Sequence, residues 1–352
     1  MYDVKTMKIE QPIIVADANI PFLKGVLDEK AVVRYLPAAE ITNEQVRDAD
    51  ALIVRTRTRC NESLLENTNV KFVVTATIGF DHIDTEYCRL KNIKWQNAQG
   101  CNADSVGQYV ASALCFWASK YKKNLSELTL GIVGWGYVGQ SVERYAKLLG
   151  MNVLRNDPPR QQIYKNESYV SLETITSVAD IITFHTPLIT EGIFATYHLA
   201  DNCFFNNLKR KPLLINSARG GVVDEQALLE AMDLGKISDC IIDCWENEPN
   251  INPVLLERSL LATPHIAGYS ADGKANATQI CVRALSRFFE LGLNDFVVEL
   301  PEKKKLDKNV ALQEQLLFAY PIERDSILFK KSPMTFEQQR SNYPMRRECD
   351  IK

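Results

Sequence analysis

Three loops in the second half of the chain carry side chains suited to proton transfer beside a carbonyl group. Arg219 lies in INSARGG, Glu248 in DCWENEP and His265 in ATPHIAG, and each loop follows a short apolar segment typical of a strand. An imidazole can take the proton of a hydroxyl group, and a guanidinium can hold a carboxylate through two charge-assisted hydrogen bonds. A carboxylate beside the imidazole would fix its tautomer. The residue types therefore indicate an acid–base site, although sequence separation does not show whether Glu248 contacts His265.

The four histidines of the chain stand in different surroundings. His82 in GFDHID, His185 in HTP and His198 in YHLA are typical of turn or packing positions, and we interpret them as structural. For His265 alone, packing in a loop explains the position as well as catalysis does. Arg219 is harder to assign to structure, because an arginine followed by two glycines at a strand end indicates close approach by a ligand.

A glycine-rich turn has the pattern of a dinucleotide site. In GIVGWGYVG, Gly134, Gly136 and Gly139 follow an apolar strand and open a helix, with Tyr137 and Val138 between the last two. The first glycine permits the tight turn, the second lets the backbone approach a pyrophosphate, and the third allows close packing of helix and strand. The N–H groups at the start of the helix would bind the pyrophosphate.

The next predicted strand ends in the acidic residue that such a site needs. Asp157 in NVLRNDPP stands where a carboxylate binds the hydroxyl groups of the adenosine ribose. Because this carboxylate would repel a 2′-phosphate, NAD is favoured over NADP as the cofactor. Arg155 and Arg160 flank Asp157 and leave NADP as the less favoured alternative.

The elements that must position these residues alternate along the chain. From residue 12 to about 100, the apolar runs PIIVA, ALIV and FVVTA alternate with polar helical stretches. Residues 104–121 predict a long helix with Asp104 as its N-cap, and a second series of strands and helices runs from TLGIVG to LLATP. We therefore predict an α/β fold of two Rossmann-like or flavodoxin-like parallel-sheet domains flanking a cleft, with a short C-terminal appendage.

A chain of 352 residues is expected to form about two domains. The helical stretch 275–291 could lead back to the first domain, which would make that domain discontinuous. We assign residues 1–103 plus about 287–302 to a substrate domain and residues 104–286 to an NAD-binding Rossmann domain. Residues 303–352 have a weaker pattern and form the appendage.

Composition excludes several classes of function. The chain is 46% hydrophobic and 24% charged with a formal net charge of -3, which argues against a nucleic-acid or anionic-membrane binder. The N-terminal segment has no apolar leader, and no window approaches the roughly 18 apolar residues of a membrane span. The nine cysteines lack CxxC pairs and are interpreted as reduced core thiols, with no metal site. We expect a cytoplasmic protein that binds small molecules.

Together the motifs resemble those of the D-isomer-specific 2-hydroxyacid dehydrogenases. The resemblance rests on GIVGWGYVG, Asp157, INSARGGVVDEQALLEAM, DCWENEP and TPHIAG, and it covers about residues 12–300. It implies that Arg219 binds the substrate carboxylate and carbonyl, that Glu248 is the partner of the histidine and that His265 is the acid–base. It also implies that the backbone of Thr77, Ile78 and Gly79 helps to hold the substrate carboxylate.

Finer motifs indicate a branch within this family. The segments AQGCNADSVGQYV, NDPPR, HTPLITEGIFATYHLAD and HIAGYSADGKANATQ resemble the branch that oxidises 4-phospho-D-erythronate with NAD in vitamin B6 biosynthesis. By this resemblance, substrate contacts fall at Thr56, Thr77 and Tyr269. The cofactor contacts that it implies are Asp157, Thr186, Ser217, Ala218, Arg219, Asp243 and Gly268.

A phosphorylated substrate needs positive charge, because its phosphate carries about -1.5 to -2 near neutral pH. Arg55, Arg57 and Arg59 alternate in VRTRTRC and would share one face of an extended segment. Arg55, nearest the strand end, is the first candidate, and a solvated surface is an equal explanation for the other two.

The tail segment FEQQRSNYPMRRE resembles part of the family's C-terminal dimerisation domain. That resemblance makes Arg346 and Arg347 candidate phosphate ligands and predicts a homodimer. The chain ends at Lys352, soon after the segment, so the dimerisation domain looks shortened.

Two alternative functions stay open at this point. A related enzyme could act on another 2-hydroxy acid such as 3-phosphoglycerate, although the HIAGY and GCNA segments fit that reading less well. A dinucleotide-sensing binding protein could share the fold without catalysis. The presence of Arg219, Glu248 and His265 together argues against that second alternative.

Overall fold

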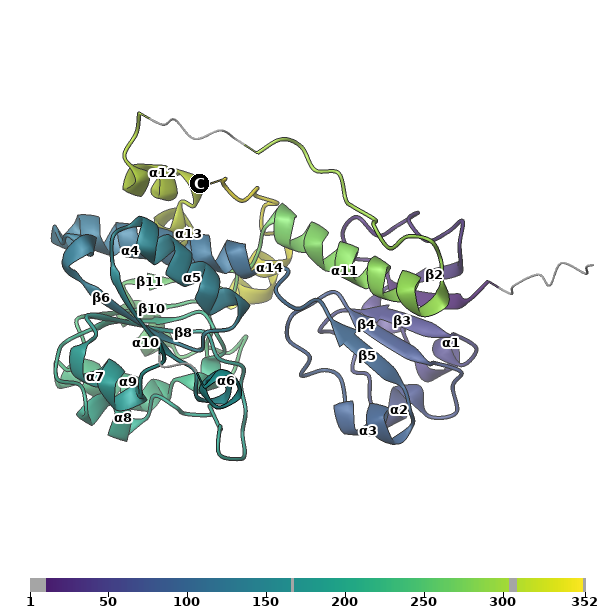
Figure 1. Ribbon diagram of the computed structural model, residues 1–352, viewed down its shortest axis with the longest axis horizontal. Helices are drawn as coiled ribbons and strands as arrows, with labels where there is room; N and C mark the ends of the chain where they lie inside the picture. Colours follow the sequence, from purple (N-terminus) through teal and green to yellow (C-terminus); the bar gives the residue numbers. More distant parts are fainter. Residues whose placement is uncertain (1–10, 166–167, 304–308, 351–352) are drawn as a thin grey trace, which may run out of the picture. The chain divides into compact units, whose positions relative to one another are not determined.

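The computed structural model describes residues 11–165, 168–303 and 309–350, and the chain divides into two compact units (Figure 1). The first unit comprises residues 1–101 and 272–301, and the second comprises residues 102–271 and 302–352. Each unit contains one parallel sheet. The predicted fold class of two parallel-sheet α/β domains is confirmed.

The sheet of the first unit has five strands in the order β2-β1-β3-β4-β5. These strands are β1 (Ile13–Asp17), β2 (Val32–Leu36), β3 (Ala51–Val54), β4 (Phe72–Thr75) and β5 (Lys94–Asn97). The short helices between them are η1 (Ala38–Glu40), α1 (Asn43–Val46), α2 (Glu62–Leu65) and α3 (Thr85–Leu90). The central strand β3 is apolar throughout because both of its faces are covered: Ile53 packs in one core cluster, while Leu52 and Val54 pack in the other.

The long helix α11 (Ala271–Phe289) belongs to the first unit. Its residues Cys281, Val282 and Leu285 are buried in the same cluster as Ile14 and Ile53 of the sheet. The boundary expected at 286/287 lies inside this helix and differs from the boundary at 271/272 that the structure shows. The apolar side of the helix explains the difference, because it needs the sheet of the first unit to cover it.

The sheet of the second unit has six strands in the order β11-β10-β9-β8-β6-β7. These strands are β6 (Thr129–Val133), β7 (Asn152–Asn156), β8 (Ile181–Phe184), β9 (Leu213–Asn216), β10 (Asp239–Ile242) and β11 (Leu261–Ala262). The helices before the C-terminal segment are α4 (Ala103–Tyr121), η2 (Leu125–Glu127), α5 (Tyr137–Leu148), α6 (Pro158–Tyr164), α7 (Leu172–Val178), α8 (Asn202–Asn206), η3 (Gly220–Val222), α9 (Glu225–Asp233) and α10 (Pro253–Arg258). Figure 1 shows α4 and α5 on one face of this sheet and α7, α8 and α9 on the other.

Helix α4 matches the predicted helix 104–121, but its start differs from the prediction. The N-cap position is Asn102, and Asp104 lies in the first turn. The Asp104 carboxylate accepts a hydrogen bond from Ser141 Oγ (2.9 Å) and pairs with Arg144, both on α5. Asp104 therefore joins two helices instead of capping one, which a pattern local to the sequence could not show.

The C-terminal segment packs on the second unit. It contains α12 (Leu312–Ala319), α13 (Ile322–Lys331), η4 (Pro333–Thr335) and α14 (Phe336–Ser341). Phe329 and Phe336 are fully buried in the core beside Trp245, and the Gln108 side chain on α4 hydrogen-bonds the backbone N–H and carbonyl of Cys349. Residues 309–350 are therefore part of this unit's core instead of a separate appendage.

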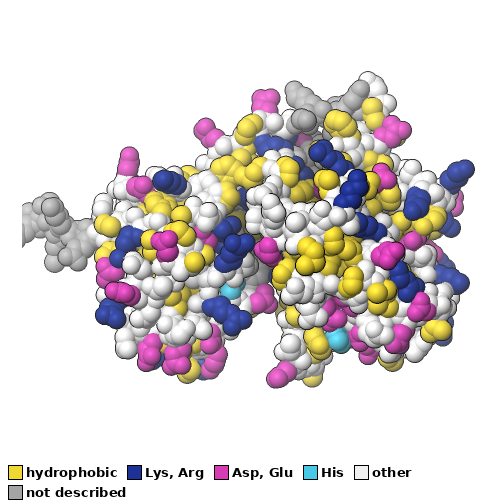
Figure 2. Space-filling view, turned by 180° about the vertical axis from the view of Figure 1, so that it is seen from behind, with side chains coloured by type: hydrophobic (Ala, Val, Ile, Leu, Met, Phe, Trp, Pro, Cys, Tyr) yellow, Lys and Arg dark blue, Asp and Glu magenta, His cyan; other side chains and the backbone are white. Residues whose placement is uncertain are grey.

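The surface has no bias toward one sign of charge on the face seen in Figure 2, where basic and acidic side chains are interspersed with neutral ones. This distribution agrees with the formal net charge of -3. Within the described ranges, no helix has the length and apolar character needed to cross a membrane.

Candidate active site

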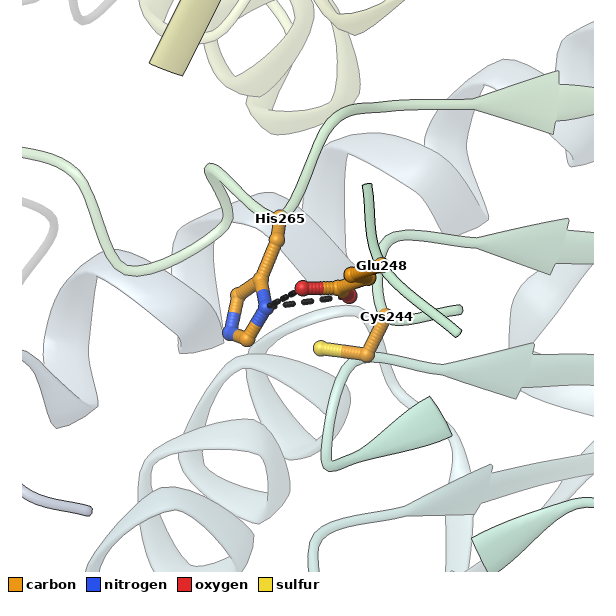
Figure 3. Close-up of side chains that lie close together, drawn as sticks. All are labelled: Cys244, Glu248 and His265. Carbon is orange, nitrogen blue, oxygen red and sulfur yellow. Dashed lines mark hydrogen bonds and ion pairs between the residues drawn. The ribbon is translucent and has the colours of Figure 1, made fainter. Parts of the chain in front are cut away.

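His265 and Glu248 form a hydrogen-bonded pair in the second unit (Figure 3). His265 Nδ1 lies 2.9 Å from Glu248 Oε2 and 3.1 Å from Oε1. The two residues come from the loops that follow β11 and β10, neighbouring parallel strands whose carboxyl ends lie at the same edge of the sheet. The contact that sequence separation left open is therefore present.

The electrostatic environment keeps Glu248 ionised. Burial raises the pKa of this carboxyl, but the charge and hydrogen bond of His265, the backbone N–H of Trp245 and the charge of Arg340 together hold it below its ordinary value. An ionised carboxylate only accepts hydrogen bonds, so His265 Nδ1 carries the proton of this bond. In the neutral imidazole, Nε2 is then the atom that can accept a proton. The His265 side chain is 28% exposed, so a ligand can reach it.

Asp243, at the end of β10, holds the His265 loop in place. Its Oδ1 accepts hydrogen bonds from Thr263 Oγ1 (2.7 Å) and Ile266 N (2.8 Å), and its Oδ2 accepts one from Ala267 N (3.0 Å). His265 itself has a φ of 55°, an uncommon conformation for a residue other than glycine, and its N–H donates to the Asp243 carbonyl. The cofactor contact expected at Asp243 stays a prediction; the hydrogen bonds that the structure shows at this carboxylate serve the loop.

Arg219 lies at the start of the loop after β9, next to the loop of Glu248. A Cβ atom at Gly220 would lie 1.9 Å from the carbonyl oxygen of Trp245, so only glycine permits this close approach of the two loops. Arg219 Nη1 donates to the Ala218 carbonyl (2.8 Å), and the Asn216 side chain donates to the carbonyls of Arg219 and Cys244. The INSARGG and DCWENEP motifs therefore form one connected site.

The Cys244 thiol lies beside the His265–Glu248 pair. Its Sγ, a carboxylate oxygen of Glu248 and an imidazole nitrogen of His265 lie within 4.8 Å of one another (Figure 3). Burial raises the pKa of Cys244 well above its ordinary value, so the sulfur is a protonated thiol that donates to the Ala218 carbonyl.

A second group of ionisable side chains adjoins the site. His198 Nε2 lies 2.6 Å from Glu246 Oε1, and the backbone N–H of Glu246 donates to Glu225 Oε1 (2.8 Å). Burial, together with the nearby carboxylates of Glu246, Glu248 and Asp224, raises the pKa of Glu225 to about 7, against the lowering effect of the Glu246 N–H. His198, His185 and His82 form hydrogen bonds with Glu246, Thr183 and Thr75 respectively, and the structural roles predicted for them remain predictions.

Replacing Glu225 by glutamine is expected to stabilise the protein at pH 8 and to change little at pH 5. Because the folded-state pKa of Glu225 is raised, its protonated form is favoured in the fold. The associated stability is present below the unfolded pKa and is lost as pH rises through about 7. Glutamine stays neutral and should remove a loss of roughly 1–3 kcal/mol. Thermal unfolding at both pH values measures the effect, with the exposed Glu230→Gln on the same helix as control. An equal shift at both pH values would contradict the prediction.

The glycine-rich turn has the geometry of a dinucleotide site. Gly134 has a φ of 91°, and a Cβ there would lie 2.7 Å from the backbone of His185, so the turn requires glycine. A Cβ at Gly136 would meet no atom within 4 Å, which leaves space for a ligand beside the backbone. Tyr137, Val138 and Gly139 form the first turn of α5, as predicted.

Asp157 closes β7 beside this turn. Its Oδ2 accepts a hydrogen bond from Trp135 N (2.8 Å) and its Oδ1 accepts one from Arg160 N (3.0 Å), so the carboxylate is fixed next to the glycine turn. Arg155 pairs with Glu143, and its guanidinium carbon lies 4.4 Å from the centre of the Trp135 ring. Because Glu143 balances the positive charge of Arg155, this arginine is less suited to bind the 2′-phosphate of NADP. The pairing therefore favours NAD over NADP.

Two buried hydroxyl groups at the ends of neighbouring strands have no hydrogen-bond partner in the described part of the chain. Thr186 Oγ1 after β8 and Ser217 Oγ after β9 are buried and have no hydrogen-bond partner among the described residues. Buried hydroxyls are normally hydrogen-bonded, so these atoms fit a site that is completed by a ligand. Both were predicted to contact the cofactor. Gly268 lies against the Asn102 side chain, and its predicted contact with the cofactor remains a prediction.

In the first unit, the segment after β3 turns instead of staying extended. Thr58 N donates to the Arg55 carbonyl (3.1 Å), and residues 56–58 form the turn. The expectation that Arg55, Arg57 and Arg59 share a strand face is therefore wrong, because the strand ends at Val54. Arg55 Nε pairs with the buried Asp17 carboxylate (3.1 Å).

Lys274 is a basic residue near Arg55 that sequence reasoning missed. Burial lowers the pKa of Lys274, and the positive charge of Arg55 lowers it further, so the two cations lie within electrostatic reach of each other. Thr56 is exposed, and Thr77 Oγ1 donates to the Gly79 carbonyl (2.8 Å) to shape the predicted carboxylate-binding loop. The substrate contacts expected at Arg55, Thr56, Thr77, Ile78 and Gly79 remain predictions.

The arginines of the C-terminal segment are placed differently from one another. The Arg346 guanidinium lies 4.0 Å from the Tyr320 ring centre and donates to Ser105 Oγ (2.7 Å), which ties the segment to α4. The phosphate contacts expected at Arg346 and Arg347 remain predictions. Arg340 was not among the predicted site residues. Its positive charge helps to lower the pKa of Glu248, and the charges of Tyr269 and Glu248 help to raise its own pKa. No local signal distinguished it from its neighbours.

Comparison with known proteins identifies the family of this chain. Residues 109–267 match the family model described as the NAD binding domain of D-isomer specific 2-hydroxyacid dehydrogenase. The chain is 51% identical over 337 residues to erythronate-4-phosphate dehydrogenase of Bacteroides thetaiotaomicron, covering 95% of this chain and 97% of that one. It is 42% identical to the enzyme of the same name from Porphyromonas gingivalis, covering 95% and 93% of the two chains.

A solved structure shows the same fold. D-lactate dehydrogenase from Aquifex aeolicus, complexed with NAD and lactic acid, superposes with a TM-score of 0.66 over 82% of this chain and 100% of that chain, at 24% identity. The match to the Bacteroides relative covers 97% of that protein. By sequence identity across nearly its whole length, the chain belongs to the erythronate-4-phosphate dehydrogenases, within the D-isomer-specific 2-hydroxyacid dehydrogenase family, and carries that family's NAD-binding domain.

Proposed function

We propose that this protein oxidises 4-phospho-D-erythronate to (R)-3-hydroxy-2-oxo-4-phosphooxybutanoate with NAD, a step of vitamin B6 biosynthesis. The observation that carries the proposal is the His265–Glu248 pair, with the Arg219 loop packed against it through Gly220. The names of the relatives supply the substrate, and the geometry supplies the chemistry.

The acid–base chemistry follows from the hydrogen-bond pattern of the pair. Glu248 accepts the Nδ1 proton of His265, which leaves Nε2 as the base for the C2 hydroxyl proton. Bound NAD would accept the hydride that leaves C2. The Arg219 guanidinium binds the carboxylate and the oxygen at C2, whose negative charge grows as the hydroxyl proton leaves. The imidazolium that forms is stabilised by the ionised Glu248.

The cofactor side of the proposal rests on residues of the same unit. Gly134, Gly136 and the first turn of α5 would hold the pyrophosphate, and Asp157 would bind the ribose hydroxyls. Thr186 Oγ1 and Ser217 Oγ would hydrogen-bond the nicotinamide half. These assignments select NAD because the charge of Arg155 is balanced by Glu143.

The test is turnover by the purified protein, followed as NADH absorbance. We expect NAD-dependent oxidation of 4-phospho-D-erythronate, with kcat/KM at least tenfold above that for 3-phosphoglycerate or D-lactate. A preference for 3-phosphoglycerate would assign another substrate. Absence of NADH formation with all three acids, despite NAD binding, would instead indicate a dinucleotide-binding protein without this activity.

The proposal extends to the setting of the enzyme. We propose a cytoplasmic homodimer, on the resemblance of the C-terminal segment to the family's dimerisation domain. Sedimentation of the purified protein tests the oligomeric state.

A further inference from the structure

A pocket in the first unit lies between strand β5 and helix α11 and shares no residue with the acid–base site. Its volume is about 340 Å³, which is within the usual range of small-molecule sites. All of its lining residues belong to the first unit: Gln96, Asn97, Gln99, Ile280, Arg283 and Arg287. The pocket therefore combines two cations with three amide side chains.

Strand β5 presents Gln96 on the side of the sheet that α11 covers. Gln96 pairs with Val74 of β4, and Val74 is buried in one cluster with Val282 and Leu285 of α11. Because paired residues of neighbouring strands point to the same face of a sheet, Gln96 points toward this helix. In the described part of the chain β5 is the last strand of its sheet, and Gln96 is exposed, so a ligand can reach the pocket from this edge.

Helix α11 contributes a stripe of three side chains to the pocket. Ile280, Arg283 and Arg287 are spaced three and four residues apart, so they lie on one face of the helix. Like charges at positions i and i+4 of a helix repel each other, and a bound anion would remove this repulsion. Within the described ranges, neither arginine forms an ion pair with a carboxylate. A pair of cations without an acidic partner is suited to bind an anion.

Both guanidinium groups keep hydrogen-bond donors for a ligand. Arg283 Nε donates to the Phe296 carbonyl (2.9 Å), which fixes the direction of the side chain. Its two Nη groups have no hydrogen bond to any other described residue. Arg287 is exposed, and its side chain forms no hydrogen bond in the described part of the chain.

The amide side chains of the pocket can bind neutral polar groups. Asn97 Nδ2 donates to the Ile78 carbonyl (2.6 Å), which leaves its Oδ1 as an acceptor. Gln96 and Gln99 are exposed, and each amide offers both donors and an acceptor. The pocket therefore fits a ligand that has hydroxyl or carbonyl groups in addition to its anionic end.

The charge of the two arginines favours phosphate among the anions. A phosphate monoester carries about -1.5 to -2 near neutral pH and has three acceptor oxygens, which match two guanidinium groups. One guanidinium is enough to hold a single carboxylate through two parallel hydrogen bonds. We propose that the β5–α11 pocket is a second ligand site, which binds the phosphate group of a small polar metabolite between Arg283 and Arg287. The proposal concerns the first unit alone and does not depend on the proposed reaction.

Arginine labelling with phenylglyoxal, mapped by peptide mass spectrometry, tests the pocket residue by residue. We expect inorganic phosphate to slow the labelling of Arg283 and Arg287 roughly fivefold or more, because bound phosphate occupies their donors. Arg47 is the internal control whose labelling should not change. It is exposed on α1, which packs through Val46 in the cluster on the opposite face of the sheet. Sodium chloride at the same ionic strength should not protect the pocket arginines selectively.

Two substitutions change the charge of the pocket. Gln96→Glu places a carboxylate there with little change of shape, and it should raise the phosphate concentration that half-protects Arg287 roughly 5- to 10-fold. Gln45→Glu makes the same change of charge at an exposed position of α1 and should leave that concentration within about twofold of the wild type. Arg287→Gln should raise the half-protecting concentration at Arg283 by a similar factor, because it removes one of the two cations.

Three results would overturn the site. In the first, phosphate slows the labelling of Arg287 no more than that of Arg47. In the second, sodium chloride protects Arg287 as well as phosphate does. In the third, Gln96→Glu keeps the full protection. Succinate, a dianion without phosphate, should protect less well, and equal protection by succinate would overturn the assignment to a phosphate group.

Turnover separates this pocket from the acid–base site. Arg287→Gln should leave kcat/KM for 4-phospho-D-erythronate within about twofold of the wild type, since the residue is given no part in the reaction. A loss of more than about tenfold would assign Arg287 to the reaction and overturn a separate site. A wild type that does not oxidise this acid contradicts the proposed function only, because the labelling experiment needs no turnover.

Discussion

Replacing His265 by asparagine is expected to lower kcat about 10²- to 10⁴-fold, the usual contribution of a general base, while NAD affinity stays nearly unchanged. Asparagine is the preferred substitute because residue 265 has a φ of 55°, a conformation that asparagine tolerates better than alanine does. The loop should therefore keep its shape while the proton acceptor is lost. Steady-state kinetics and NAD binding measured on the same preparation check both parts.

His198→Asn is the control for this experiment. His198 also forms a close pair with a glutamate, at 2.6 Å from Glu246, and also has a positive φ, so the substitution makes a similar local change away from the Glu248 carboxylate. We expect its kcat to stay within a few-fold of the wild type. Turnover by His265→Asn at the wild-type rate would show that proton transfer uses another group.

Replacing Arg219 by lysine is expected to lower kcat/KM for the 2-hydroxy acid by about 10²- to 10³-fold, the scale seen when a donor to a developing oxyanion is removed. Lysine keeps the charge but cannot make the two parallel N–H bonds of a guanidinium to a carboxylate. Part of the effect should appear in KM, because the carboxylate is bound before reaction. Kinetics with varied acid at saturating NAD measure the two components.

The control for Arg219→Lys is Arg210→Lys, a surface residue paired with Asp180 at 2.6 Å. This substitution should leave kcat/KM unchanged, since exposed ion pairs contribute little. An Arg219→Lys enzyme with kcat/KM within threefold of the wild type would assign substrate binding to a different cation.

Some features of the structure are set by residues that lie close together in the sequence. The glycine turn and Asp157 were predictable because strand, turn and helix follow one another within a short stretch of chain. The position of Arg219, Glu248 and His265 at one edge of the sheet was predictable for a related reason, since each follows a parallel strand of the same sheet and parallel strands end at one edge.

Other features depended on contacts between distant residues. Asp104 has the position of an N-cap but binds Ser141 and Arg144 of the next helix. Helix α11 follows the His265 loop directly, yet its apolar face is buried in the first unit. In both cases the local pattern allowed two outcomes, and packing against a distant element selected one.

The sequence by itself determined the fold class, because the alternation of strands and helices is a short-range pattern, and it predicted the glycine turn and the acid–base residues, which remain predictions as site residues. Only the tertiary structure decided that Glu248 contacts His265 and that the C-terminal segment packs into the core of the second unit. The physical reason is that such contacts arise where separate segments bury their apolar side chains together. Phe329 and Phe336 join the C-terminal segment to this core by packing near Trp245, and nothing in the local spacing of residues 309–350 indicates that contact.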